Sequence, residues 1–190
     1  FLSSDYVFDG ETGNYTEQDT PNPITEYGNH KFIIEQFIQD TFKEGNFLIL
    51  RLRKIFSLFS YDNTFVTQIM NDLYNKKQVK AGYDQYFCPL LIDDLLSIIY
   101  TMLNQDLTGI YHICSSEKWS RYELTRYIAN RISISDNLIE KISINDLPNQ
   151  PLRPKDTSMV NKKILQSINI SFTPIQSAIE NIFHKLAFHV

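Results

Sequence analysis

The sequence has 190 residues, of which 43% are hydrophobic and 21% charged, with a formal net charge of −4. This composition is typical of a globular protein that buries a core, and it argues against a disordered chain. The 18 basic residues are scattered, which argues against nucleic acid or an anionic membrane as a partner. No apolar run reaches the roughly 18 residues that a membrane-spanning helix needs.

The first half of the chain predicts a strand, a helix and a second strand. Residues 1–8 predict a buried strand that stops at the turn pair Asp9-Gly10, and residues 11–22 predict a polar loop. A helix is predicted from about residue 24 to 42, and one stripe that would face the sheet is formed by Ile24, Tyr27, Lys31, Ile34 and Ile38. Residues 47–52 are almost continuously apolar, which is typical of a parallel strand covered on both faces. The order indicates an α/β fold with a parallel sheet.

The second half alternates between helices and strands. Helices are predicted over residues 63–74, 92–104 and 120–132 and after Thr173-Pro174, and strands over residues 78–81, 110–114 and 139–144. Ser120 and Glu123 have the spacing of a capping box, and Asp93 and Asp94 are interpreted as capping charges of their helix. Residues 147–156 predict a proline-rich connector.

Tyr27 and Lys31 lie four residues apart, on the same face of the predicted helix. An ammonium beside a phenol favours the ionised form of the phenol. Lowering the pKa of a phenol from about 10 to about 7 takes roughly 4 kcal/mol. The phenol of Tyr27 then becomes a proton donor near neutral pH. The hydroxyl of Ser4 would hold a substrate carbonyl oxygen while a nicotinamide delivers hydride to the carbon. These residues predict a carbonyl reductase.

Several motifs along the chain resemble one known family. They are Ser-Ser-Asp-Tyr-Val-Phe-Asp-Gly at residues 3–10, Tyr27-Gly28-x-x-Lys31 with Glu35 beyond, Asp84-Gln85 with Pro89, Gly109-Ile110-Tyr111-His112, and Arg153-Pro154. Together they look like the extended short-chain dehydrogenase/reductases, specifically the dTDP-4-dehydrorhamnose reductase branch. The resemblance covers nearly all of the chain.

The resemblance implies a partial Rossmann-like, NAD(P)-binding parallel sheet with a smaller α/β substrate-binding part. Residues 1–60 would belong to the Rossmann-like domain and carry the Tyr/Lys helix. Residues 61–190 would mainly bind substrate, with some segments returning to the sheet. The implied activity is the reduction of a 4-keto-deoxysugar nucleotide by NADPH or NADH.

The resemblance also assigns roles to particular residues. Tyr27 would be the proton donor, and Tyr27 and Lys31 would contact the nicotinamide ribose of the cofactor. Ser4 would hold the carbonyl, and Asp5 and Tyr6 would line the sugar site. In the similar 4,6-dehydratases a glutamate stands at the position of Tyr6, so elimination of water would lack its base here.

The chain departs from the family in two ways. The six glycines contain no Gly-x-x-Gly-x-x-Gly run for the cofactor pyrophosphate. Since the chain also starts at Phe1, inside what would be a family strand, it is expected to be the C-terminal portion of a longer protein, and inactive by itself. Lys54 stands where the family often has a tryptophan, which puts a stacking contact with the sugar in doubt.

A second function of another class stays open. The regulatory subunit of methionine adenosyltransferase resembles the same family and shares the string at residues 3–10, so a non-catalytic binding subunit is the alternative. Cys88 and Cys114 have no metal-like spacing and are interpreted as free buried thiols of a cytoplasmic protein, with no metal site. The oligomeric state stays open, with a homodimer as one option.

Overall fold

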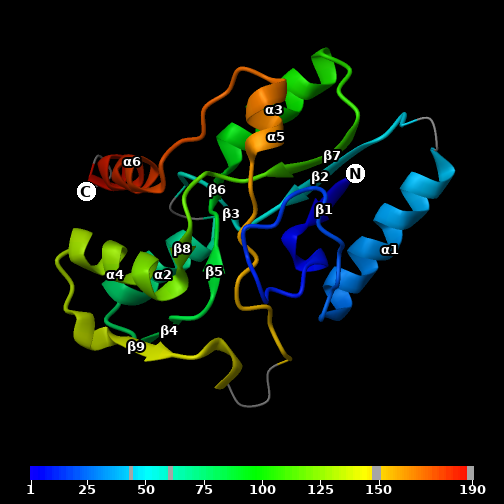
Figure 1. Cartoon of the computed structure of the whole chain (residues 1–190). Helices are drawn as coiled ribbons and strands as arrows, with labels where there is room; N and C mark the ends of the chain where they lie inside the picture. Colours follow the sequence, from blue (N-terminus) through cyan, green and yellow to red (C-terminus); the bar gives the residue numbers. More distant parts are fainter. Residues whose placement is uncertain (43–44, 60–61, 147–150, 188–190) are drawn as a thin grey trace.

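The computed structural model of the chain describes residues 1–42, 45–59, 62–146 and 151–187, with side chains as far as Phe183. These residues form two packed parts that meet in the middle of the molecule (Figure 1). Three short 3₁₀ helices cover Asp5–Val7, Asp136–Leu138 and Ile144–Asp146. The strands and α-helices are β1 Leu2–Ser4, α1 Glu26–Thr41, β2 Leu48–Leu52, β3 Ile55–Phe56, α2 Phe65–Tyr74, β4 Val79–Gly82, β5 Tyr86–Phe87, β6 Leu90–Leu91, α3 Ile92–Asn104, β7 Gly109–Ile113, β8 Trp119–Ser120, α4 Arg121–Arg131, β9 Ile139–Ile142, α5 Lys162–Ser167 and α6 Ile175–Ala187.

Three parallel strands form the main sheet, in the order β1-β2-β7. Ser4 of β1 lies beside Leu52 of β2, and Arg51 of β2 lies beside His112 of β7. Since the strands are parallel, their carboxyl ends share one edge of the sheet, which is where open α/β folds bind ligands. Ser4 and the residues that follow Leu52 therefore meet at this edge.

Helices cover both faces of the main sheet. Leu50 and Leu52 pack in one apolar cluster with Ile98 of α3 and Ile164 of α5. Because successive side chains of a strand point to opposite faces, Arg51 points the other way, towards α1. The sheet thus lies between α1 on one side and α3 with α5 on the other (Figure 1).

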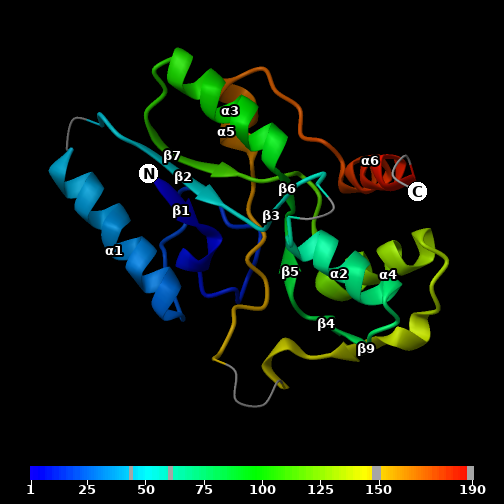
Figure 2. The same ribbon diagram turned by 180° about the vertical axis from the view of Figure 1, so that it is seen from behind.

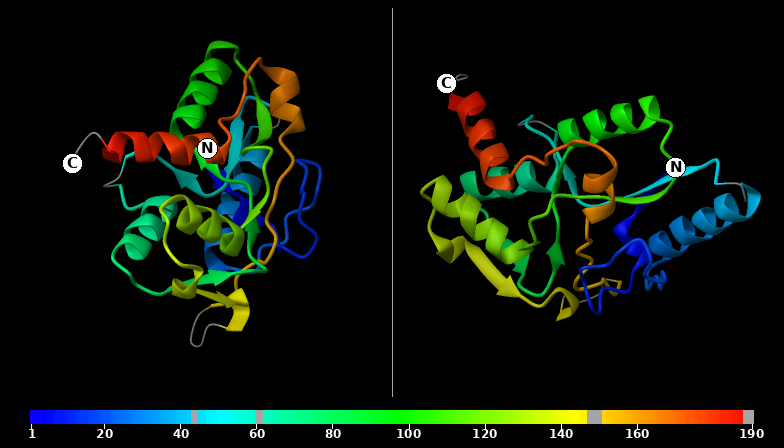
Figure 3. Two further views of the ribbon diagram at one scale, coloured as in Figure 1. Left: turned by 90° about the vertical axis from the view of Figure 1, so that its left-hand side faces the viewer. Right: turned by 45° about the horizontal axis from the view of Figure 1, so that its top comes forward.

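The second part packs around an apolar cluster that includes Phe56, Leu73, Phe87, Leu124 and Ile179. Helices α2 and α4 lie side by side against the parallel pair of β4 and β9, as Figure 2 shows from behind. Two short pairs, β3 with β6 and β5 with β8, lie near the centre of the molecule. Helix α6 lies at the opposite end of the molecule from α1 (Figure 3).

The predicted α/β class with a parallel sheet is confirmed. The strand predicted over residues 1–8 is wrong beyond Ser4, because the Ser4 hydroxyl accepts a hydrogen bond from the Tyr6 amide at 3.2 Å and starts a 3₁₀ helix. Gly10 has a φ of +79°, as a turn glycine should, and the capping box of Ser120 and Glu123 is confirmed. The two-domain division at residue 60 stays a prediction, although β7 does return to the main sheet.

The sequence did not predict α5 or the two-residue strands β3, β5, β6 and β8. A two-residue strand is too short to show a period in its apolar residues. Asp94 lies in the first turn of α3, and its carboxylate accepts hydrogen bonds from the amide and hydroxyl of Thr173 at 2.7 and 2.9 Å. Residues 147–150 of the predicted connector lie outside the described residues.

Candidate active site

A pocket of about 250 Å³ lies at the carboxyl edge of the main sheet, beside the first turns of α1. The ends of β1 and β2 and one face of α1 supply its lining residues, which are Leu2, Ser3, Ser4, Asp5, Tyr27, Lys31, Leu52, Arg53, Lys54 and Ile55. The structure therefore brings together four of the five predicted site residues, namely Ser4, Asp5, Tyr27 and Lys31. Tyr6 is not among the residues that line this pocket.

The first turns of α1 position Tyr27 and Lys31. The helix begins after Thr25, whose hydroxyl accepts a hydrogen bond from the Gly28 amide at 3.0 Å. Tyr27 is 54% exposed, so its phenol is open to a ligand. The Nζ atom of Lys31 lies 5.6 Å from the centre of the Tyr27 ring and donates a hydrogen bond to the Leu2 carbonyl at 2.9 Å.

The stripe predicted to face the sheet is only partly right, because Lys31 contacts β1 whereas Tyr27 is exposed. Ile24 and Ile34 are exposed, and the buried residues of α1 are Gly28 and Glu35. A methyl group on Gly28 would lie 2.8 Å from the carbonyl carbon of Tyr6 and closer still to the oxygen. The helix thus approaches the backbone of residue 6 directly, which only a residue without a side chain allows.

Ser4 and Asp5 are already engaged with protein groups. The buried Ser4 hydroxyl donates a hydrogen bond to Oδ1 of Asp5 at 3.0 Å. Since a hydroxyl carries a single proton, Ser4 must release Asp5 before it can donate to a substrate oxygen. Oδ2 of Asp5 is held by Arg53 in a buried ion pair, so Asp5 lines the pocket as a neutralised group.

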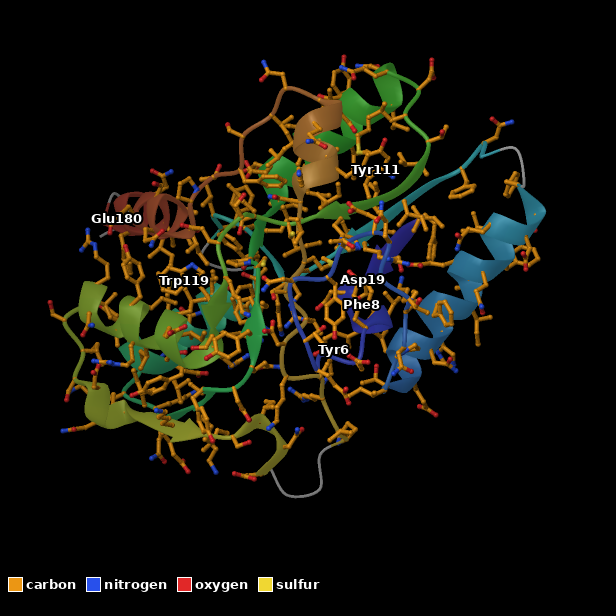
Figure 4. The ribbon with its side chains drawn as sticks, in the orientation of Figure 1. Tyr6, Phe8, Asp19, Tyr111, Trp119 and Glu180 are labelled. Atoms are coloured by element: carbon orange, nitrogen blue, oxygen red, sulfur yellow. The ribbon has the colours of Figure 1, made fainter. Side chains whose placement is uncertain are left out.

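Tyr6 lies between α1 and the second part of the molecule (Figure 4). Its ring meets the Tyr27 ring edge-on, with 6.0 Å between the ring centres, and the Arg53 guanidinium lies over its face at 5.5 Å. Burial raises the pKa of Tyr6, and the nearby charges of Arg153 and Arg121 oppose this effect. Tyr6 therefore contacts Tyr27 and Arg53, two of the residues that line the pocket.

Positive charge gathers around this part of the molecule. Burial, and then the charges of Arg53, Arg121 and Arg153, lower the pKa of Lys54 to about 8. Burial also lowers the pKa of Arg53, whose guanidinium keeps its charge beside the Asp5 carboxylate. Lys54 lies 5.8 Å from the centre of the Phe65 ring. The pocket thus offers a positive environment to a ligand.

A buried polar network fixes α1 to the sheet. Glu35 is fully buried and accepts hydrogen bonds from Nε and Nη2 of Arg51, at 3.1 and 2.7 Å, and from the hydroxyl of Ser3. Nη1 of Arg51 lies 3.4 Å from Nε2 of His112. Burial, and then the charge of Arg51, lower the pKa of His112 to about 3, so its imidazole is neutral.

Sequence reasoning did not predict the ion pairs of Arg53 with Asp5 and of Arg51 with Glu35. Two basic residues inside and just after an otherwise apolar strand, in Leu50-Arg51-Leu52-Arg53, were a usable signal, since buried charges need partners. Cys88 and Cys114 are free and buried, as predicted. Within the described ranges, no three His, Cys, Asp or Glu side chains gather as a metal site. None of the described helices has the length and apolar character to cross a membrane.

The parallel sheet of β1, β2 and β7 with helices on both faces is a Rossmann-like arrangement, and a tyrosine and a lysine of one helix turn lie at its carboxyl edge. The chain belongs to the family described as the RmlD substrate binding domain, which matches residues 1–188. The resemblance to the extended short-chain dehydrogenase/reductases, in their dTDP-4-dehydrorhamnose reductase branch, is therefore confirmed.

Reductases and regulatory subunits are both among the named relatives that match the chain. The dTDP-4-dehydrorhamnose reductase of Aggregatibacter actinomycetemcomitans is 26% identical over 193 residues, which cover 95% of this chain and 64% of the relative. The methionine adenosyltransferase 2 subunit beta of Mus musculus is 25% identical over 190 residues, which cover 95% of this chain and 55% of the relative. The chain thus spans less than two thirds of the length of these relatives.

Solved structures share the fold. A hypothetical dTDP-4-dehydrorhamnose reductase from Sulfolobus tokodaii matches with a TM-score of 0.79 and 30% identity, over 93% of this chain and 61% of that one. The dTDP-4-dehydrorhamnose reductase from Bacillus anthracis, solved in complex with NADP, matches with a TM-score of 0.83 and 24% identity, over 97% of this chain and 64% of that one. The Rossmann-like expectation is confirmed by these folds.

Proposed function

We propose that the protein reduces a 4-keto-deoxysugar nucleotide with NADPH or NADH, and that this chain supplies the proton donor and the sugar site. The observation that carries the proposal is the meeting of Ser4, Tyr27 and Lys31 in one pocket at the carboxyl edge of the sheet. The reductase names among the relatives indicate the substrate to test first, dTDP-4-dehydrorhamnose.

The pocket residues divide the reaction between them. Tyr27 gives its phenolic proton to the carbonyl oxygen, and Lys31 stabilises the resulting phenolate from the same helix face. Ser4 turns from Asp5 to donate a hydrogen bond to the same oxygen. The cofactor, when bound, supplies the hydride that adds to the carbonyl carbon.

The residues of this chain fit only one end of the cofactor. The pocket of about 250 Å³ has room for a nicotinamide ring, and Lys31 and Tyr27 carry donors for the ribose hydroxyls. The six glycines contain no run that could form a pyrophosphate turn. We therefore propose that a segment of the protein other than these residues holds the pyrophosphate.

The test of this proposal is Tyr27→Phe in the complete gene product, assayed with NADPH and dTDP-4-dehydrorhamnose. Loss of the proton donor should lower kcat by about 100-fold or more, with the folded state retained. Tyr100→Phe is the matched control, because Tyr100 is 71% exposed on α3, and it should leave kcat unchanged. Wild-type turnover by Tyr27→Phe would refute the assignment.

A regulatory subunit is the second candidate, favoured by the methionine adenosyltransferase subunits among the relatives. The same incubation separates the two functions. Turnover of the sugar nucleotide supports the reductase, whereas tight binding of NADPH without turnover supports the regulator.

A further inference from the structure

The candidate pocket holds more positive than negative charge. Lys31, Arg53 and Lys54 line it, and Asp5 is its single carboxylate. Asp5 is paired with Arg53, and the Lys31 ammonium donates to the Leu2 carbonyl. Among the described residues, no hydrogen bond or ion pair involves the side chain of Lys54, so its ammonium has no counter-ion.

Arg53 adds unused donors beside this ammonium. Its side chain is 1% exposed, and Nη1 is the atom that pairs with Asp5. The Nε and Nη2 atoms are buried and have no partner. Leaving a buried donor unpaired is destabilising, and more so when the donor is charged, so these atoms need an explanation. An acceptor on a ligand in the pocket would provide it.

Two more cations extend the positive field beyond the pocket. Arg121, at the start of α4, and Arg153 are both close enough to oppose the charge of Lys54. A neutral sugar would offer hydroxyl acceptors but would leave this repulsion in place. A negatively charged group would both accept hydrogen bonds and reduce the repulsion.

We infer that Arg53 and Lys54 form an anion subsite of the candidate pocket, which takes a negatively charged oxygen group of the ligand. The inference rests on the proposed function for the claim that the ligand is a sugar nucleotide. Such a molecule has two sources of anionic oxygen: the diphosphate of the nucleotide and, in acidic sugars, a ring carboxylate. Both match the planar guanidinium of Arg53 and the point charge of Lys54.

The experiment measures binding without cofactor or turnover, so it is independent of the reductase proposal. The complete gene product is titrated calorimetrically at low salt with thymidine diphosphate, inorganic pyrophosphate and glucuronate, and with thymidine and glucose as uncharged counterparts. Lys54→Met is compared with wild type, with Lys54→Arg as the charge-retaining variant and Lys80→Met as the matched control. Lys80 lies on β4, is exposed and pairs with Glu140.

We expect Lys54→Met to raise the Kd of an anionic probe by about tenfold or more, since one charge-assisted hydrogen bond is lost. Lys54→Arg and Lys80→Met should stay near wild type. An effect on thymidine diphosphate and pyrophosphate assigns the subsite to the diphosphate, and an effect on glucuronate assigns it to a sugar carboxylate. If Lys54→Met folds and weakens no anionic probe, or if Lys80→Met weakens them equally, the inference is wrong even when the protein is an active reductase.

Discussion

Replacing Gly28 by alanine tests whether the direct contact between α1 and the backbone of Tyr6 sets the geometry of the pocket. The added methyl would lie 2.8 Å from the Tyr6 carbonyl carbon and 3.1 Å from Cβ of Pro23. Both distances are shorter than ordinary van der Waals contact, so α1 must move away. A shift of about 1 Å in a reacting group can lower a rate by about 100-fold.

Helix propensity alone gives the opposite expectation for stability. Alanine is favoured over glycine in a helix by about 1 kcal/mol. Overpacking costs about 1–3 kcal/mol, so we expect the free energy of unfolding to fall by up to about 2 kcal/mol. We also expect kcat for the sugar nucleotide to fall by about 100-fold.

The assays are NADPH oxidation and urea unfolding of the complete gene product. Asn29→Ala is the control, because Asn29 is the next residue of α1, is exposed, and gains helix propensity without meeting the Tyr6 backbone. A Gly28→Ala protein that is as stable as wild type and fully active would refute the reasoning.

Two further predictions concern the network under α1. Glu35→Ala should lower the free energy of unfolding in urea by about 3–5 kcal/mol, because it leaves the charge of Arg51 buried without its partner; unchanged stability would contradict this. The pKa of His112 is about 3 in the folded protein and about 6.5 when unfolded, so the unfolded state binds the extra proton between these values. The free energy of unfolding should therefore fall as the pH decreases from about 6.5 towards 3. In urea unfolding, His112→Gln should remove this part of the pH dependence. An equal pH dependence in the variant would exclude His112 as its source.

Elements with strong local signals were predictable from the sequence. The apolar residues 47–52, the helix of residues 92–104 and the capping box at Ser120 each carry their information within a few neighbouring residues. The end of β1 at Ser4 was not predictable in this way. It depends on hydrogen bonds from the Tyr6 amide to the Ser4 hydroxyl and from the Phe8 amide to the Asp5 carbonyl, in a segment whose composition favours a strand.

The candidate site was predictable as a set of residues and only partly as an arrangement. The motifs pointed to Ser4, Tyr27 and Lys31, and the structure places all three on one pocket. The ion pair of Asp5 with Arg53 joins residues 48 positions apart. Nothing in the sequence near either residue indicates this pairing. The neutralisation of Asp5 and the unpaired charge of Lys54 could therefore be recognised only from the fold.

The face of α1 that meets the sheet shows how this helix is held in place. Gly28, Lys31 and Glu35 follow the three- and four-residue spacing of one helix face, and each meets a polar group of β1, β2 or the 3₁₀ helix Asp5–Val7. Gly28 abuts the Tyr6 carbonyl, Lys31 donates to the Leu2 carbonyl, and Glu35 binds Arg51. Burial of an apolar face is non-directional, whereas these polar contacts fix the rotation and position of the helix. Tyr27, next to Gly28, therefore owes its place in the pocket to a polar face that a hydrophobic pattern cannot reveal.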